Sequence, residues 1–370
     1  MATGPVDNVI LLADCYKTSH HKAYPPGTSS LYAYFESRGG RFPYTVFFGL
    51  QYILKRWLCG PVITKEMVLE AKEVLGTVFK RDDVFNEDGW NYILERHGGR
   101  IPVRIRAVPE GSVVPVKNVL FTVESTDPAV PWVTNFFETL LVQVWYPMTV
   151  ATISRIHKQV IHYYMSLTHD SLETVEFSLH DAGYRGVSSV ESAALGGAAH
   201  MINFKASDTV AGSSMLRKFY QLKGVAGFST PSSEHSTVTT WGREGEAQAH
   251  RHMLEVYEEG TLVVCAIPMT SGSVSRTSGA MIFATLSFSV ARRVAASTSD
   301  PTAVTQPRSS LGYKILKQIP FPRYSQANFL SVVIFLTLVV APIDVVPCYI
   351  QISASKTDLF RPVLVLKRIG

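Results

Sequence analysis

The chain has 370 residues, of which 46% are hydrophobic and 18% charged, and this excludes a chain that is disordered throughout. We expect two domains. The net charge of +5 is unevenly distributed, because residues 266–370 carry 11 Lys and Arg against three acids, whereas residues 1–265 carry 24 basic and 27 acidic groups. The positive charge therefore belongs to the C-terminal tail and is poor evidence for nucleic-acid binding, which needs clustered basic residues.

The cysteines are scattered and show neither metal-site spacing nor a dense disulfide framework: Cys15, Cys59, Cys265 and Cys348. This usage is typical of a reducing compartment, and we expect a cytoplasmic protein. The apolar run from Val9 to Ala13 is short and is followed at once by Asp14, so it is not a secretory signal.

The first part of the chain mixes strand and helix patterns. Apolar spacing predicts, in order, a strand over 8–13, a turn over 24–27, a strand over 30–36, a helix over 47–58, an amphipathic helix over 64–79 and an antiparallel β unit over 101–123. Thr64 is expected to be the N-cap of the amphipathic helix, with Glu66 in its first turn. This combination predicts a β-rich domain with helices.

The second part begins with helical patterns over 134–145 and 150–167, whose aromatic residues we interpret as core: Phe136, Phe137, Trp145, Tyr163 and Tyr164. An alternating α/β pattern follows. It predicts strands at 175–179, 202–205, 226–229 and 261–265, with helices over 189–203, 209–220 and 237–257 between them. This order is typical of parallel strands connected by helices.

The stretch from His180 to Ser189 lies between the first of these strands and its helix, and it holds an imidazole, a carboxylate, a guanidinium and two glycines. Ser188 and Glu191 have the spacing of a capping box, which would start the helix there. A helix N-terminus beside Arg185 suits a phosphate. Taken alone, however, the stretch is better interpreted as a βα connection whose polar residues only cap the helix.

Two later predicted strands favour a functional site instead. Asp208 and His235 each follow the C-terminal end of a strand, as Arg185 does. In a barrel of parallel strands, the loops after the strand C-termini share one rim, where catalytic residues collect. Three polar loops in phase therefore predict a site.

The segment 327–343 is strongly apolar but a little short for a membrane span, which needs about 20 residues. A buried β segment, an unstructured apolar run and a membrane anchor all remain open for it, and we do not expect the protein to bind membranes.

Several motifs in the first 265 residues are distinctive: Asp-Cys-Tyr-Lys at 14–17, Tyr-Phe-Glu-Ser-Arg at 34–38, Phe-Phe-Gly-Leu-Gln-Tyr-Ile-Leu at 47–54, Asp-Asp-Val-Phe-Asn-Glu at 82–87, Asn-Val-Leu-Phe-Thr-Val-Glu at 118–124, His-Asp-x-Gly-Tyr-Arg-Gly-Val-Ser-Ser at 180–189, Asp-Thr-Val-Ala-Gly at 208–212 and Glu-His-Ser-Thr at 234–237. Together they resemble the nicotinamide phosphoribosyltransferase family. Residues 8–265 resemble the N-terminal half of the family. The resemblance implies transfer of phosphoribose from 5-phosphoribosyl 1-diphosphate to nicotinamide, which yields nicotinamide mononucleotide, an NAD precursor, and diphosphate.

The resemblance also implies roles for five residues in a homodimer with sites at the subunit interface. Tyr16 would stack on the nicotinamide ring from the partner subunit, and Arg38 would contact phosphate across that interface. Arg185 would bind near nicotinamide and diphosphate, and Asp208 would accept a hydrogen bond from the carboxamide. His235 would be phosphorylated by ATP to assist turnover, and Mg²⁺ would accompany the diphosphate.

The implied fold is a truncated type II phosphoribosyltransferase α/β barrel with an N-terminal α+β domain. We expect an N-terminal domain over 8–125, a helical connection with the first βα units over 126–265, and a poorly ordered tail over 266–370. The family's Arg-Pro-Asp-Ser-Gly, Gly-Asp-Gly and glycine-rich phosphate motifs do not occur after Cys265. A tail translated from an alternatively spliced or misread transcript fits this break.

Another departure is Ala182, which stands where the family has phenylalanine, opposite the stacking tyrosine. Its loss predicts weaker nicotinamide binding. Two alternatives remain open beside an active transferase. One is a catalytically impaired isoform that acts as a dimer partner, and the other is a nicotinate phosphoribosyltransferase, against which the charge of Asp208 argues.

Overall fold

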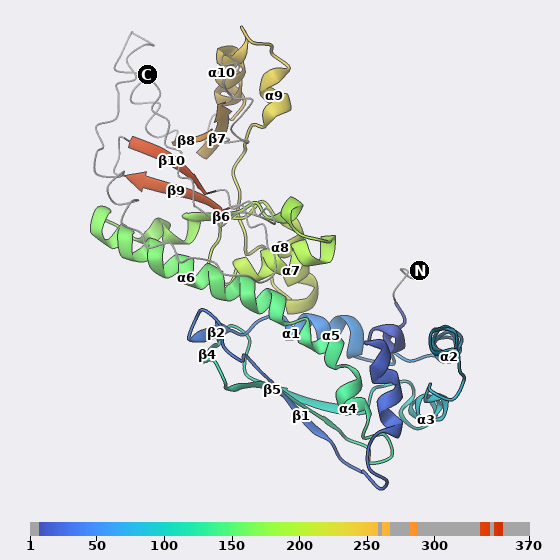
Figure 1. The fold of residues 1–370 in the computed structure, drawn as a ribbon. Coiled ribbons are helices and arrows are strands. Elements are labelled where there is room, and N and C mark those ends of the chain that lie inside the picture. Colours follow the sequence, from blue (N-terminus) through green and yellow to red (C-terminus); the bar gives the residue numbers. More distant parts are fainter. Residues whose placement is uncertain (1–6, 258–260, 267–281, 288–333, 341–343, 351–370) are drawn as a thin grey trace, which may run out of the picture. The chain divides into compact units, whose positions relative to one another are not determined.

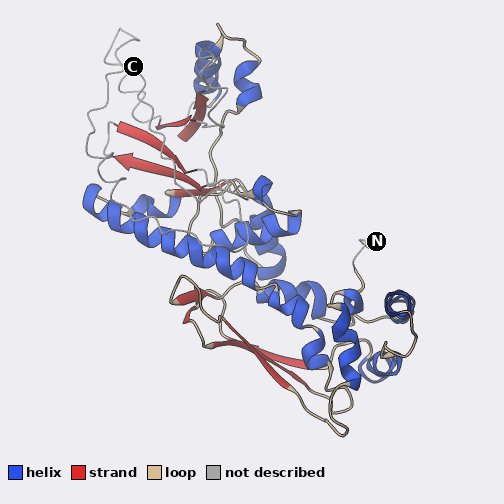
Figure 2. Cartoon of the chain, in the orientation of Figure 1, coloured by secondary structure: helices blue, strands red, loops and turns tan. Residues whose placement is uncertain are grey.

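The computed structural model describes residues 7–257, together with the backbone of four strands at 261–266, 282–287, 334–340 and 344–350. Helices and strands are mixed in this part of the chain, in agreement with the expected α/β class (Figures 1 and 2). The chain divides into two compact units. Unit 1 comprises Met1–Ile156, Ala198–Ile202 and Ser214–Gly224, and unit 2 comprises His157–Gly197, Asn203–Ser213 and Val225–Gly370. The sequence-based division at residues 125 and 265 stays a prediction.

The described helices are α1 (Leu50–Ile53), α2 (Lys65–Phe79), α3 (Glu87–His97), α4 (Val133–Phe136), α5 (Glu138–Val142), α6 (Trp145–Thr168), α7 (Val190–His200), α8 (Val210–Tyr220), α9 (His235–Thr239) and α10 (Glu246–Val256). The described strands are β1 (Tyr32–Glu36), β2 (Tyr44–Val46), β3 (Val103–Ala107), β4 (Val113–Pro115), β5 (Val119–Ser125), β6 (Leu179–Asp181), β7 (Thr261–Ala266), β8 (Ile282–Ser287), β9 (Ile334–Val340) and β10 (Asp344–Ile350).

The main sheet of unit 1 is antiparallel, with strand order β1-β5-β3. Phe35 on β1 pairs with Phe121 on β5, and their rings stack with centroids 4.8 Å apart. The expected antiparallel unit over 101–123 is confirmed for β3 and β5, but β4 pairs with β2 instead of with its neighbours in sequence.

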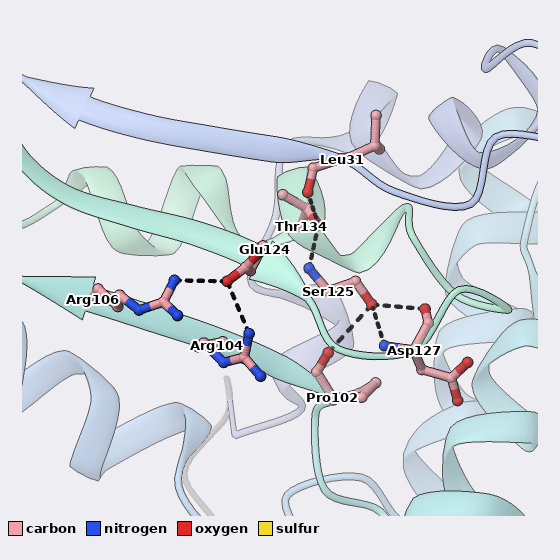
Figure 3. Close-up of polar contacts among 8 residues, drawn as sticks. All are labelled: Leu31, Pro102, Arg104, Arg106, Glu124, Ser125, Asp127 and Thr134. Carbon is pink, nitrogen blue, oxygen red and sulfur yellow. Dashed lines mark hydrogen bonds and ion pairs between the residues drawn. The ribbon is translucent and has the colours of Figure 1, made fainter.

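Hydrogen bonds of polar side chains connect this sheet to α4 and connect β3 to β5 within it (Figure 3). Glu124 on β5 accepts hydrogen bonds from Arg104 at 3.2 Å and from Arg106 at 2.9 Å, both on β3. Thr134 in α4 accepts from the Ser125 amide at 2.9 Å and donates to the Leu31 carbonyl at 3.3 Å. One hydroxyl therefore links α4 to β5 and to the segment that leads into β1.

The core of unit 1 is an aromatic cluster around Trp90, which is 1% exposed. Trp132, Phe136 and Phe137 meet its ring edge-on, with centroids 4.9, 4.9 and 6.3 Å away. Edge-to-face packing of this kind is favoured by the quadrupoles of the rings. Two of the residues interpreted as core, Phe136 and Phe137, are thus confirmed, whereas Trp145 is exposed, as is Tyr163 in unit 2.

The N-terminal strand predicted over 8–13 is wrong, since Val9–Leu11 form a 3₁₀ turn. Asn8 explains the difference. Its side-chain oxygen accepts from the Ile10 amide, and its side-chain amide donates to the Met67 carbonyl and to Glu70. Asparagine side chains that bond the nearby backbone offer it an alternative to a strand ladder. The helix over 64–79 is confirmed as α2, with Thr64 accepting from the Met67 amide.

The first turn of α1 is capped by a carboxylate from elsewhere in unit 1. Glu110 accepts from the amides of Gly49 at 3.0 Å and Gln51 at 2.6 Å, and from the Tyr220 hydroxyl at 2.7 Å. Tyr220 also stacks on Phe48 with ring centroids 5.1 Å apart. The end of α8 is therefore built into the core of unit 1.

The core of unit 2 gathers apolar side chains of α6, of β6 and of the segments beside them: Ile161, Met165, Val175, Leu179 and Phe204. The strand predicted over 175–179 begins only at Leu179, because Glu173–Phe177 form a 3₁₀ turn. The helix predicted over 237–257 is interrupted and consists of α9 and α10.

The apolar segment 327–343 contains β9, which pairs with β10 and with β6 in antiparallel fashion, so residues 334–340 form a β-strand, whereas the expected burial of this segment stays a prediction. The rest of that segment lies outside the described residues. Within the described part of the chain, no helix has both the length and the apolar character needed to cross a membrane. The strands described there also form no closed barrel.

Candidate active site

Three short backbone segments of unit 2 run side by side and in parallel. Asp181 at the end of β6 pairs with Ser207, and Ala206 pairs with Phe228. Hydrogen bonds connect them: the Asp181 amide donates to the Ala206 carbonyl at 3.1 Å, and the Phe228 amide donates to the Lys205 carbonyl at 2.7 Å. The strand predicted over 202–205 is thus reduced to bridges at Ala206 and Ser207, slightly later in the chain, and the strand predicted over 226–229 to a single bridge at Phe228. Their parallel order and their common edge are as expected.

Asp181 is used to hold this edge together. One of its carboxylate oxygens, Oδ1, accepts from the Gly183 amide at 2.9 Å, and the other, Oδ2, accepts from the Ser207 hydroxyl at 3.2 Å. Its carbonyl accepts from the Asp208 amide at 2.8 Å. With both oxygens bonded to the scaffold, this carboxylate is a structural group that shapes the loop after β6.

Asp208 stands at the same edge in a different situation. Its Oδ1 accepts a hydrogen bond from the Ser229 hydroxyl and lies 3.0 Å from Nε2 of His180. This is a close contact of the imidazole with the carboxylate, since Nε2 of His180 meets the geometry of a hydrogen bond to no acceptor in the described part of the chain. The Asp208 side chain is still 53% exposed, which leaves room for a ligand to reach it.

The surroundings of Asp208 favour its charged form. Partial burial alone would raise the pKa of this carboxyl, but the contacts with His180 and Ser229 and the positive charge of Arg185 hold the pKa below its ordinary value. Arg185 therefore lies close enough to influence Asp208 electrostatically. The structure brings together two of the sequence-predicted residues, Arg185 and Asp208.

The loop that carries Arg185 leads into α7. Arg185 is exposed in the 3₁₀ turn Tyr184–Gly186. The helix is capped by Ser189, whose hydroxyl accepts from the Ser192 amide at 3.0 Å, so the expected cap at Ser188 is wrong by one residue. The loop that carries Arg185 thus runs directly into the N-terminal turn of α7. That this turn offers amide donors to an anion beside Arg185 stays a prediction.

His235 is exposed at the first position of α9, where the Glu234 amide donates to the Thr237 hydroxyl at 3.0 Å. Tyr16 and Arg38 belong to unit 1. Tyr16 is 56% exposed, in a 3₁₀ helix, Cys15–Lys22, that is anchored by the Lys17–Glu138 ion pair and by a 2.8 Å bond from Thr139 to Asp14. Arg38 follows β1 and is exposed.

Three residues at this edge received no individual role from the sequence, and two of them stand in the motif over 180–189. They are His180, which contacts Asp208, and Asp181, which holds the loop. Ser229 is the third, and its position just after Phe228, at the end of a parallel segment, was the available signal.

Comparisons with known proteins agree with the motifs. A family model described as nicotinamide phosphoribosyltransferase, N-terminal domain, matches residues 8–105, and one described as the nicotinate phosphoribosyltransferase family matches residues 177–267. A nicotinamide phosphoribosyltransferase of Xanthomonas campestris pv. campestris is 49% identical over 263 residues, which are 71% of this chain and 55% of that protein. The N-terminal part of the chain is thus similar to nicotinamide phosphoribosyltransferases, and residues 8–105 match the N-terminal domain of that family.

A second nicotinamide phosphoribosyltransferase, from Acinetobacter baylyi, is 31% identical over 271 residues, which are 70% of this chain and 54% of the relative. The chain thus spans about half the length of these nicotinamide phosphoribosyltransferases. A crystal structure of human nicotinic acid phosphoribosyltransferase is 21% identical, with a TM-score of 0.43, and the match covers 62% of this chain and 40% of that one.

Proposed function

We propose that this chain carries the nicotinamide-recognising part of a nicotinamide phosphoribosyltransferase, a pentosyltransferase of NAD salvage. The reaction transfers phosphoribose from 5-phosphoribosyl 1-diphosphate to the ring nitrogen of nicotinamide and releases diphosphate. The observation that carries the proposal is the cluster of Asp208, His180 and Arg185 at the ends of parallel segments. It lies within the range matched by the phosphoribosyltransferase family model, 177–267.

Asp208 suits recognition of a carboxamide. A carboxylate that stays ionised accepts a hydrogen bond from the amide N–H₂, and its charge repels the carboxylate of nicotinate. This charge supports nicotinamide over nicotinate as the substrate. Tyr16 would stack on the ring from the partner subunit of a homodimer, and its exposed position fits a residue that serves another chain.

Arg185 would stabilise the leaving group. Breaking the bond between ribose C1 and diphosphate builds negative charge on the diphosphate, and a cation fixed at that point lowers the barrier. Arg38 would contact phosphate across the subunit interface.

Mg²⁺ would arrive with the diphosphate. Residues 7–257 include no group of three or more His, Cys, Asp or Glu side chains that could hold a metal ion by themselves. Magnesium is commonly bound through substrate phosphates with few protein ligands, so this donor set fits an ion carried by the substrate. The steps assigned here to Asp208 and Arg185 do not depend on it.

His235 would be the residue that ATP phosphorylates to assist turnover. Its exposure at the start of α9 fits a side chain that a second nucleotide must reach. The parallel segments ending at Asp181, Ser207 and Phe228 would be the first units of the family's α/β barrel.

The test is an assay of the purified full chain with nicotinamide, 5-phosphoribosyl 1-diphosphate and Mg²⁺, read as nicotinamide mononucleotide by mass spectrometry. Magnesium-dependent product that is lost in Asp208→Asn supports the transferase. Calorimetric binding of nicotinamide without product would point to the alternative, a dimer partner without turnover. Preference for nicotinate in the same assay would overturn the assignment to nicotinamide.

A further inference from the structure

The two carboxylates at the shared edge differ in how their oxygens are used. Asp181 has both oxygens occupied by the scaffold, through Gly183 and Ser207. Asp208 has two contacts, from Ser229 and His180, and both fall on Oδ1. Within residues 7–257 its other oxygen, Oδ2, takes part in no hydrogen bond or ion pair with the protein. The edge therefore presents one unused carboxylate oxygen.

The groups that hold Oδ1 come from two different segments on either side of Asp208. His180 stands on β6, and Ser229 follows the bridge at Phe228. Nε2 of His180 is buried from solvent, and Oδ1 lies 3.0 Å from it. Contacts from both neighbouring segments leave the Asp208 carboxylate less rotational freedom than an exposed aspartate normally has. Its side chain is therefore already ordered before a ligand binds, which lowers the entropic cost of binding.

We propose that Ser229 and His180 are positioning residues that fix Oδ1 of Asp208, so that Oδ2 is the single acceptor presented to the carboxamide of the substrate. The inference rests on the proposed function for the identity of the ligand. It assigns to Ser229 and His180 an action through Asp208, without contact of their own with the reacting atoms. Preorganisation of this kind favours a ligand that donates one hydrogen bond at one place.

The contact itself is tested without any ligand. The full chain is labelled with ¹³C-aspartate, the carboxyl signal of Asp208 is assigned with Asp208→Asn, and its pKa is measured by titration in Ser229→Ala, Ser229→Thr and His180→Gln. We expect Ser229→Ala and His180→Gln to raise the pKa of Asp208, because each removes a contact that favours the ionised form. Ser229→Thr keeps the hydroxyl and should keep the pKa low.

Matched controls are available in the same unit. Ser232 is an exposed serine close to Ser229 in sequence, and its hydroxyl donates to the Thr230 carbonyl. His162 is exposed on α6. Ser232→Ala and His162→Gln should leave the pKa of Asp208 unchanged. Circular dichroism shows which variants fold, and His180→Gln and Ser229→Thr carry the test if Ser229→Ala does not.

The consequence for binding is measured by calorimetry with nicotinamide and nicotinate. Loss of a hydrogen bond to a charged group should weaken nicotinamide binding about tenfold in Ser229→Ala, with recovery in Ser229→Thr. An unchanged Asp208 pKa in both Ser229→Ala and His180→Gln overturns the inference, and so does a shifted pKa with unchanged nicotinamide affinity. A wild-type chain that binds no nicotinamide contradicts the proposed function instead, while the titration still decides whether Asp208 is held.

Discussion

Nε2 of His97 lies 2.7 Å from Oδ2 of Asp127, and this pair joins the end of α3 to the turn that follows β5. The same oxygen accepts from the Tyr92 hydroxyl at 3.1 Å, while Oδ1 accepts from the Ala129 amide at 2.8 Å. The amide of Ala129, followed by His97 and Tyr92, holds the pKa of Asp127 below its ordinary value.

This lowered pKa predicts acid-sensitive stability in unit 1. The contribution of Asp127 is complete above the unfolded-state pKa of about 4 and is lost as the pH falls through the lower folded-state pKa. We expect the free energy of unfolding to fall less steeply in Asp127→Asn than in the wild type between about pH 5 and about pH 3. Urea denaturation followed by tryptophan fluorescence measures it, since Trp90 and Trp132 lie in this unit. Asp170→Asn, an exposed site, should follow the wild type; equal slopes for all three chains would contradict the prediction.

The close packing of Gly197 in α7 against the site leaves too little room for a larger side chain at this position. A Cβ atom at this position would lie 2.8 Å from Cγ2 of Thr209 and 3.3 Å from Oδ2 of Asp181. Gly197→Ala gains helix propensity, but forcing a methyl group into this contact typically costs about 1–3 kcal/mol. We expect a net loss of stability of about 1 kcal/mol in thermal unfolding followed by circular dichroism. Adding Thr209→Ser, which removes the opposing methyl group, should restore it; no recovery would place the strain elsewhere.

Removal of the Glu110 carboxylate, which is partly exposed, should lower the stability of unit 1 considerably. It satisfies two amides at the start of α1 and the Tyr220 hydroxyl. Glu110→Ala leaves these donors without their partner, and each unsatisfied buried donor costs about 1–3 kcal/mol. We expect a loss of about 2 kcal/mol or more in urea denaturation. Glu73→Ala, an exposed glutamate on α2, is the control, and a loss no larger than in that variant would refute the capping role.

Under the proposed function, placing at position 182 the phenylalanine that the family resemblance implies should raise the affinity for nicotinamide. A second aromatic face against nicotinamide is worth about 0.5–1.5 kcal/mol beyond the buried area. Ala182→Phe should therefore bind nicotinamide about twofold to tenfold more tightly in calorimetry. Ala182→Leu separates ring stacking from added bulk, because it restores volume without a ring. A Michaelis or dissociation constant equal to that of the wild type would falsify the stacking argument.

The sequence was a good guide where a local signal and the tertiary structure agree. Thr64 caps α2 as predicted, because its hydroxyl bonds the Met67 amide within one turn. The parallel order at the site was predictable from the alternating pattern. The expected strand over 8–13 failed because Asn8 takes its bonds from α2, a partner distant in sequence that periodicity does not detect.

The sequence predicted which residues lie at the candidate site better than it predicted the hydrogen bonds between them. Arg185 and Asp208 were identified from the strand ends, and the structure brings them close enough to interact. Whether an aspartate has one or both oxygens bonded to the scaffold depends on side-chain directions, such as those of Asp181 and Ser207, and a linear pattern does not encode these. The position of Ser229 after a strand end was visible in the sequence, but its bond to Asp208 was not.

The return of the chain to unit 1 at Ala198–Ile202 and again at Ser214–Gly224 has a practical consequence for dissecting the protein. No single peptide bond separates the two units, so a gene fragment that stops after α6 lacks Phe219 and Tyr220, which complete the packing around Phe48 and Tyr52. Expression of residues 1–156 alone would expose the Phe48 and Tyr52 rings to solvent on the side where Tyr220 and Phe219 pack. Deletion mapping of this protein therefore has to keep α8 in every fragment meant to contain the N-terminal sheet.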